Sequence, residues 1–250
     1  MRSQESTPPV EERLVLNEVD LTRADFSGRR IQRFGVTASR FTECDFSGVR
    51  IFKGGSFGAG GDYTEYLGCV FDQAELTRVN AGRARFVNCS FRDVRIRDMF
   101  SHDGEFVDCL FTGRIEGAVF NGRPPSYEGM APNPKKLLEF RGNDFSGAVL
   151  EDVGFRNGVA LSQQSLPTGP DYVLLLDAGP VLRRAWDLAE ALPAADPHRG
   201  SIRSALRLGL DELANGQQDF FRTLMNRKDV AGGRALLALL ADASAEIAAD

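Results

Sequence analysis

The sequence has few of the residues on which metal sites, disulfides and membrane spans depend. Its 250 residues include 4 cysteines, 2 histidines and 1 tryptophan. No Cys-x-x-Cys pair occurs, and His102 and His198 stand far apart, so we expect neither a metal site nor a cofactor. No apolar run approaches the roughly 18 residues of a membrane-spanning helix. A net charge of −5 lacks the basic excess of general nucleic-acid binders, so no direct nucleic-acid contact is expected.

These absences predict a cytoplasmic protein that does not enter a membrane. Residues 1–13 are polar and contain Pro8-Pro9, which predicts a disordered N-terminal arm and not a signal peptide.

Hydrophobic residues recur at every fifth position through the first half of the chain. The series runs Leu16, Leu21, Phe26, Ile31, Val36, Phe41, Phe46 and Ile51, lapses at Ser56 and Gly61, and resumes from Tyr66 to Phe111. A helix repeats every 3.6 residues and a strand every 2, so neither element alone sustains this period. Short internal periods of this kind indicate a solenoid.

A second period, four times as long, contains the shorter one. Asp25-Phe26-Ser27-Gly28 recurs as Asp45-Phe46-Ser47-Gly48, and Cys69, Cys89 and Cys109 are spaced by 20. We therefore expect residues 20 apart to stack. One inward column would then hold Phe26, Phe46, Tyr66, Phe86 and Phe106, and the next Ile31, Ile51, Phe71, Phe91 and Phe111. The cysteines fall in inward positions for small residues, which favours buried thiols over disulfides.

At this point the chain resembles the pentapeptide-repeat family, whose motif places a small residue and Asp or Asn before a central Leu or Phe. The best matches are Ala24-Asp25-Phe26-Ser27-Gly28, Cys44-Asp45-Phe46-Ser47-Gly48 and Asn143-Asp144-Phe145-Ser146-Gly147. The resemblance covers about residues 14–120 and 137–160. It implies a mainly β fold, a right-handed quadrilateral β-helix in which four repeats complete one coil and the central residues point inward.

The pattern divides the chain into four parts. After the arm, the β-helix is expected over 14–160, with its register slipping by one after Phe111 and a proline-rich loop projecting at about 121–136. A linker is expected at 161–177 and an α-helical region at 178–250, with one of four helices near Phe220–Met225. These helices would cap the open end of the solenoid. Family members often pair at this end, which implies a homodimer through the C-terminal helices.

No catalytic group of residues emerges from the sequence. The run from Gly54 to Asp62 is glycine-rich like a phosphate-binding loop, but it lacks the Gly-Lys-Ser/Thr ending and a following helix. We interpret it as a weak coil or a bulge. No nucleophile stands beside a base in a recognisable turn. The chain is therefore not expected to be an enzyme.

The residue before each central position should point outward. Along the predicted Phe26 column these residues are Asp25, Asp45, Glu65, Arg85 and Glu105, a column of carboxylates interrupted by one arginine. Together with Arg123 and Tyr127 of the projecting loop, the four acids form the candidate interaction surface. A basic patch is expected on the neighbouring side, made of Arg30, Arg33, Arg50 and Lys53.

Two functions remain open at this stage. The first is a non-enzymatic interaction scaffold with a protein partner. The second follows from the resemblance, because some pentapeptide-repeat proteins imitate DNA with an acidic rod. They bind DNA gyrase and protect it, so the resemblance implies a gyrase or type II topoisomerase inhibitor that confers resistance to topoisomerase poisons. The net charge of −5 is smaller than a DNA mimic is expected to carry.

Overall fold

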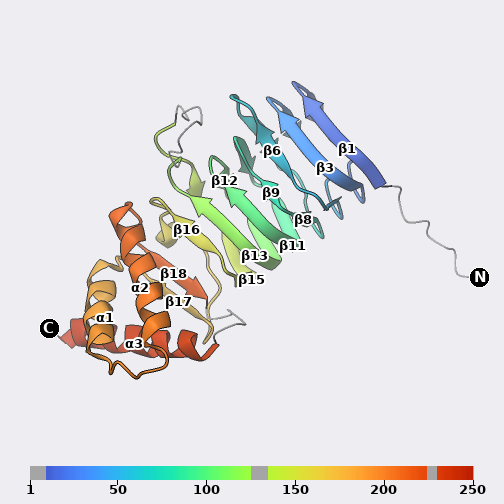
Figure 1. The fold of residues 1–250 in the computed structure, drawn as a ribbon. Helices are drawn as coiled ribbons and strands as arrows, with labels where there is room; N and C mark the ends of the chain where they lie inside the picture. Colours follow the sequence, from blue (N-terminus) through green and yellow to red (C-terminus); the bar gives the residue numbers. More distant parts are fainter. Residues whose placement is uncertain (1–9, 125–134, 224–229, 250) are drawn as a thin grey trace, which may run out of the picture.

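The computed structural model describes residues 10–124, 135–223 and 230–249. Parallel strands stack along most of the chain into a rod, and the helices gather at its C-terminal end (Figure 1). The first strand, β1, lies at the other end. No helix in the described part of the chain is long and apolar enough to cross a membrane.

Two parallel sheets form the rod within the described residues. The first has ten strands: β1 (Val10–Asn17), β3 (Arg30–Thr37), β5 (Arg50–Ile51), β6 (Gly55–Ala59), β8 (Glu75–Thr77), β9 (Val79–Asn80), β11 (Ser90–Ser101), β13 (Leu110–Asn121), β15 (Asp144–Glu151) and β16 (Gly154–Arg156). The second has six: β2 (Asp20–Thr22), β4 (Arg40–Thr42), β7 (Thr64–Leu67), β10 (Ala84–Val87), β12 (Glu105–Val107) and β14 (Phe140–Arg141). The parallel, stacked architecture agrees with the mainly β expectation.

One coil is five residues longer than the others near it, and this changes the predicted stacking. Leu21 pairs with Phe41 and Tyr66 with Phe86, both at the expected spacing of 20. Phe41, however, pairs with Tyr66, at a spacing of 25. The spacing rises from 20 at Ile51 to 22 at Ala59 and 25 at Tyr66, so the extra residues enter within β6 and in the segment that follows it. The predicted columns are therefore wrong beyond residue 53, and each later residue moves to the neighbouring column.

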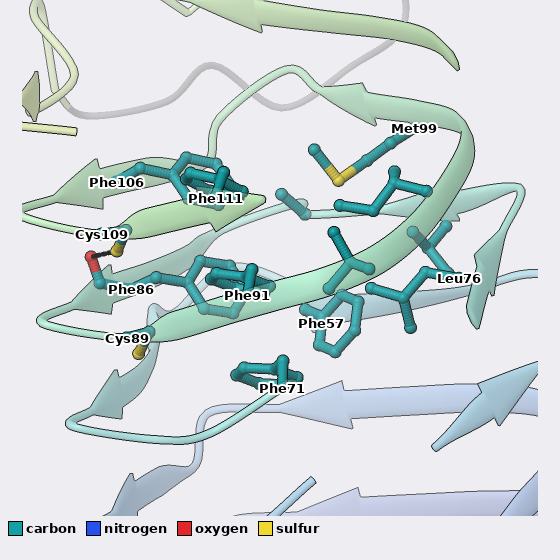
Figure 2. Close-up of a cluster of buried hydrophobic side chains, with 14 of the residues drawn as sticks. Phe57, Phe71, Leu76, Phe86, Cys89, Phe91, Met99, Phe106, Cys109 and Phe111 are labelled. Atoms are coloured by element: carbon teal, nitrogen blue, oxygen red, sulfur yellow. Dashed lines mark hydrogen bonds between the residues drawn. The ribbon is translucent and has the colours of Figure 1, made fainter. Parts of the chain in front are cut away.

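The true aromatic columns are continuous through the core (Figure 2). One contains Phe26, Phe46, Phe71, Phe91, Phe111 and Phe145, with successive ring centroids 4.4–4.8 Å apart and rings nearly parallel. The other contains Phe41, Tyr66, Phe86 and Phe106, at 4.7–5.0 Å. Rings of the two columns meet edge to face, as between Phe86 and Phe91 at 5.7 Å. The inward placement of the predicted central aromatics is thus correct, although their partners differ.

The cysteines form a third inward column of free, buried thiols. Cys44, Cys69, Cys89 and Cys109 each donate a weak hydrogen bond to a carbonyl of the preceding coil; Cys109 reaches the Phe86 carbonyl at 3.5 Å (Figure 2). Burial raises the pKa of the Cys89 thiol well above its ordinary value. These contacts support the expectation of small buried side chains.

The later coils carry the register slip and the projecting segment. Ile96 pairs with Ile115 at a spacing of 19, after an irregularity between Phe91 and Val94, which confirms the predicted slip by one. Phe106 then pairs with Phe140, at a spacing of 34. The proline-rich segment is therefore an insertion within a coil and does not replace one. Its residues 125–134 lie outside the described residues.

The two ends of the repeat region differ from the expectation. Residues 10–13 belong to β1, which pairs in parallel with β3, so the predicted arm is too long by these four residues. The segment 161–177 is not a free linker. It contains a 3₁₀ turn, η1 (Leu161–Gln163), and the strand β17 (Tyr172–Leu175). Leu161 and Leu166 are buried in the core of the rod, because they close its C-terminal end.

The C-terminal unit has three described helices and a two-stranded antiparallel sheet. The helices are α1 (Gly179–Ala191), α2 (Arg199–Ala214) and α3 (Val230–Ala249), and β17 pairs with β18 (Phe220–Thr223). The prediction of a helix near Phe220 is wrong, because this segment is a strand. A separate apolar core joins the helices through Leu182, Leu206 and Leu240.

Candidate functional site

The predicted acidic column does not exist as one surface. Asp25 and Asp45 are neighbours, but the longer coil places Val70 and Ser90 after them. Glu65 and Glu105 lie in a second column whose order is Asp20, Arg40, Glu65, Arg85 and Glu105. Acidic and basic residues therefore alternate along the rod. This alternation replaces the repulsion of stacked carboxylates by attraction.

Ion pairs follow from this alternation. Arg40 Nε lies 2.8 Å from Glu65 Oε2, and Arg85 contacts Glu105 at 3.5 Å and Glu139 at 2.9 Å. Glu105 is fully buried and also accepts a hydrogen bond from Lys135 at 2.7 Å. A buried, paired carboxylate contributes to the structure and offers no free charge to a partner.

Asp25 and Asp45 have a local structural role as well. Each accepts a hydrogen bond from the backbone N–H two residues later, at 2.8 Å. The bonds from Ser27 lower the pKa of the exposed Asp25 carboxyl. Asp144 makes the same turn at 2.9 Å. The aspartate of the repeat therefore stabilises the turn beside it.

The loop residues of the candidate surface lie apart from these acids. Arg123 is exposed beside Gly158 and Gly216, where the rod meets the C-terminal unit; a side chain at Gly216 would begin 2.8 Å from its guanidinium. Tyr127 lies outside the described residues. The structure thus distributes the described members of the predicted surface over three places.

A groove of about 710 Å³ lies between the rod and the C-terminal unit. We name it the junction groove. One wall comes from β11, β13 and β15 of the rod, and the other from α2 and β18. Asp98, Phe100 and Asp152 line the first wall, while Leu208 and Glu212 line the second.

The junction groove combines acidic and apolar side chains. Phe100 is 47% exposed and Leu208 44% exposed, although both are large and apolar. Glu116 pairs with Arg97 at 3.5 Å, whereas Asp98 and Asp152 make no hydrogen bond or ion pair within 4 Å among the described residues. The groove therefore presents an excess of carboxylates over arginines next to accessible apolar surface, and Arg156 and Arg222 are its basic lining residues.

Gln217 and Asp219 fix the C-terminal unit to the rod. Gln217 is 3% exposed; its side-chain oxygen accepts bonds from the N–H groups of Gly158 and Val159, each at 3.0 Å. Its amide donates to the carbonyl of Val159 at 2.9 Å. Asp219 accepts from the N–H of Leu161 at 2.8 Å. Because the buried Gln217 and the half-buried Asp219 are both hydrogen-bonded to the rod, the two walls of the junction groove are held in one arrangement.

Burial in the groove shifts the pKa values of two ionisable groups. Burial raises the pKa of Glu212, against the opposing effect of Arg156, whose Nε lies 3.1 Å away. Burial likewise lowers the pKa of Arg222, which Asp152 partly offsets. Charges in such a place interact more strongly with a ligand than charges in bulk water do.

The raised pKa of Glu212 predicts a pH-dependent stability difference between the wild type and Glu212→Gln. The folded state holds the Glu212 proton more tightly than the unfolded chain, so this stabilisation is complete below about pH 4. It is lost as the pH rises through the folded-state pKa. Urea unfolding at a series of pH values measures the effect. A difference in unfolding free energy that stays constant with pH would contradict the burial of Glu212.

The described residues contain no group of three or more His, Cys, Asp or Glu side chains that could hold a metal ion. The junction groove could not be predicted from the sequence, because Asp98, Asp152 and Glu212 lie in separate elements and share no motif. A signal available in the sequence was Phe100, a large apolar residue in the outward position directly before the central residue Ser101.

Comparison with known proteins gives matches among solved structures alone. No family model matches the chain, and no curated protein matches it. Among solved structures, it is similar to a trypsin-treated form of QnrB1, a plasmid-mediated fluoroquinolone resistance protein. The identity is 16%, the match covers 61% of this chain and 79% of that chain, and the TM-score is 0.32. Full-length QnrB1 matches at 17% identity over 61% and 81% of the two chains, with a TM-score of 0.22.

A further similar structure is HetL from the cyanobacterium Nostoc sp. strain PCC 7120. It is a pentapeptide-repeat protein involved in heterocyst differentiation regulation. The identity is 11%, the match covers 65% of this chain and 92% of that chain, and the TM-score is 0.19. At these TM-scores the superpositions say nothing of function. The five-residue repeat of this chain and its stack of parallel coils resemble those of pentapeptide-repeat proteins.

Proposed function

We propose that the protein is a non-enzymatic scaffold that binds a protein partner in the junction groove. One observation carries the proposal. The exposed apolar side chains of Phe100 and Leu208 line the same groove as the carboxylates of Asp98 and Asp152, which have no hydrogen-bond or ion-pair partner within 4 Å among the described residues. Protein interfaces combine an apolar centre with complementary charge at the rim. The occupant that fits best is a segment of a partner protein with lysine or arginine next to large apolar residues.

The fold supports this role. The proposal takes the rod to be a right-handed quadrilateral β-helix in the cytoplasm, whose stacked coils keep the groove wall rigid. A rigid wall lowers the entropy that is lost on binding. A homodimer through the C-terminal helices, which the family resemblance implies, stays a prediction that sedimentation of the full chain can check.

Fluorescence anisotropy with two labelled peptides of equal length tests the proposal. One peptide alternates leucine with lysine, and the other alternates leucine with glutamate. We expect binding of the lysine peptide alone, and about tenfold weaker binding when Asp98→Asn and Asp152→Asn are combined. Glu12→Gln combined with Glu18→Gln, which removes two exposed charges at the far end of the rod, is the matched control. Equal binding of both peptides, or no loss in the double variant, would refute a charge-selective groove.

A DNA-mimicking gyrase or topoisomerase inhibitor is the second candidate. The adjacent outward carboxylates of Asp25 and Asp45 favour it, whereas the ion pairs of Arg40 and Arg85 in the neighbouring column weaken it. Gyrase supercoiling, titrated with the protein in the presence and absence of a fluoroquinolone, separates the two functions. The scaffold proposal expects no effect. Inhibition that disappears in Asp25→Lys with Asp45→Lys would support mimicry instead.

A further inference from the structure

The glycine-rich run that resembles a phosphate loop borders a second hollow, at the N-terminal part of the rod. This hollow of about 340 Å³ is lined by Arg13, Arg33 and Lys53, by Val15, and by Gly54 and Gly55 at the start of the run. We name it the basic hollow. It lies far along the chain from the junction groove and shares no lining residue with it.

The three cations come from consecutive coils and stack along the rod. Arg13 pairs in register with Arg33. The N–H of Lys53 donates to the carbonyl of Gln32 at 2.8 Å, which places Lys53 beside Arg33 in the next coil. Since neighbouring parallel strands are about 4.8 Å apart, the three side chains begin at steps of about that length.

No carboxylate among the described residues neutralises these cations. None lines the basic hollow, and two acids of the same sheet have other partners. Glu11 contacts Arg29 at 3.6 Å, and Glu75 contacts Arg50 at 3.6 Å. Like charges directly opposite one another in a sheet repel, so this stack is unfavourable unless an anion occupies the hollow.

The chemistry of the lining selects phosphate. Arginine offers two parallel N–H donors that match two phosphate oxygens, and lysine adds a point charge. Gly54 and Gly55 line the hollow but do not open their backbone to an anion, because the carbonyl oxygens of Arg78 and Phe34 occupy the space of their missing side chains. The site therefore depends on the three stacked cations and differs from the strand–loop–helix of nucleotide-binding proteins.

We propose that the basic hollow binds an anion with two or more linked phosphates. The stack from Arg13 to Lys53 spans two coil steps, about 10 Å at the spacing of parallel strands. A single phosphate reaches two adjacent cations, whereas a diphosphate contacts all three. The ligand class is therefore a free diphosphate or oligophosphate. The phosphates of a nucleic-acid backbone share this chemistry but belong to another class of partner.

Isothermal titration calorimetry with pyrophosphate and orthophosphate tests the site on the full chain. We expect pyrophosphate to bind more tightly than orthophosphate. Arg33→Gln and Lys53→Gln should each weaken pyrophosphate binding about tenfold, as the loss of a charged hydrogen bond predicts. Arg33→Lys should retain part of the affinity. Arg95→Gln removes an exposed arginine of the same sheet that does not line the hollow, and it should bind like the wild type.

The possible results decide the proposal in either direction. Tighter pyrophosphate binding that depends on Arg33 and Lys53 supports the site. Absence of heat, or the same loss in Arg95→Gln as in Arg33→Gln, overturns it, because the second result indicates attraction by general charge alone. A third titrant, a single-stranded oligothymidine of about 20 nucleotides, addresses the backbone phosphates of nucleic acid. Binding of this titrant without binding of pyrophosphate also overturns the proposal. Circular dichroism of each variant confirms that it is folded.

Discussion

Replacing Phe86 by aspartate is expected to prevent the rod from folding. The Phe86 ring is 2% exposed and stacks between Tyr66 at 4.7 Å and Phe106 at 4.9 Å. Truncating such a ring costs about 3–5 kcal/mol, and an unpaired buried carboxylate costs several kcal/mol more. Together these terms approach the roughly 5–15 kcal/mol that stabilise a typical domain. Far-UV circular dichroism and urea unfolding of Phe86→Asp measure the loss.

Asn88→Asp provides the matched control, because it adds the same charge two residues away. Asn88 is exposed and has a φ of 52°, a conformation that asparagine and aspartate both tolerate. We expect this variant to unfold at nearly the wild-type urea concentration. A folded, β-rich Phe86→Asp would show that the aromatic column does not face inward.

The sequence predicted which side chains are inside the rod. The five-residue period is set locally, because each central residue turns inward by the geometry of its own short strand and turn. Phe26, Phe91 and Phe111 are accordingly buried as expected. The slip after Phe111 was also predictable, since a change of one residue shifts the phase of the period.

The sequence could not predict which inward residues stack on one another. The additional residues in the coil that contains β6 number five, the same as the period itself. Such an insertion leaves the phase of the repeat unchanged and only moves later residues to the next column. The pairing of Phe41 with Tyr66 at a spacing of 25 is therefore invisible in the repeat. The lapse at Ser56 and Gly61 was the only sign of it.

This single insertion also decides the charge pattern of the surface. Without it, Asp45 would precede Glu65 in one acidic column. With it, Glu65 stacks on Arg40, and Asp45 is followed by Val70. The DNA-mimic hypothesis drawn from the sequence depends on outward carboxylates that recur every 20 residues along one column. The longer coil interrupts that column.

The junction groove and β18 depend on tertiary contacts, which a single sequence does not show. The spacing of Phe220 and Phe221 with later apolar residues suits a helix. In the structure Phe221 packs against Tyr172 at 5.7 Å and Phe155 at 5.8 Å, while β18 pairs with β17. Packing against the end of the rod overrides the local helical preference.

The longer coil exists because a glycine permits a close approach of two backbones. Gly58 in β6 is buried, and a Cβ atom there would lie 2.3 Å from the carbonyl carbon of Arg83 and 2.5 Å from the nitrogen of Ala84. Backbone atoms held in a neighbouring coil cannot move aside as a flexible side chain can. Even the smallest side chain at this position must therefore separate two coils.

We expect Gly58→Ala to destabilise the rod by about 2–3 kcal/mol, near the upper range for overpacking a well-packed core. The displacement of the coils also disturbs the adjacent carbonyl of Phe57, which accepts a hydrogen bond from the buried Tyr66 hydroxyl at 3.0 Å.

Gly35→Ala in the neighbouring strand β3 should instead stabilise the rod. The nearest atom to its added Cβ is Cγ2 of Val15 at 3.9 Å, an ordinary contact. A compatible alanine there stabilises by about 0.4–1 kcal/mol, because it restricts the unfolded chain. Urea unfolding measures the free energy of unfolding of both variants. Equal changes at the two glycines would contradict the close contact of Gly58 with the backbone of the neighbouring coil.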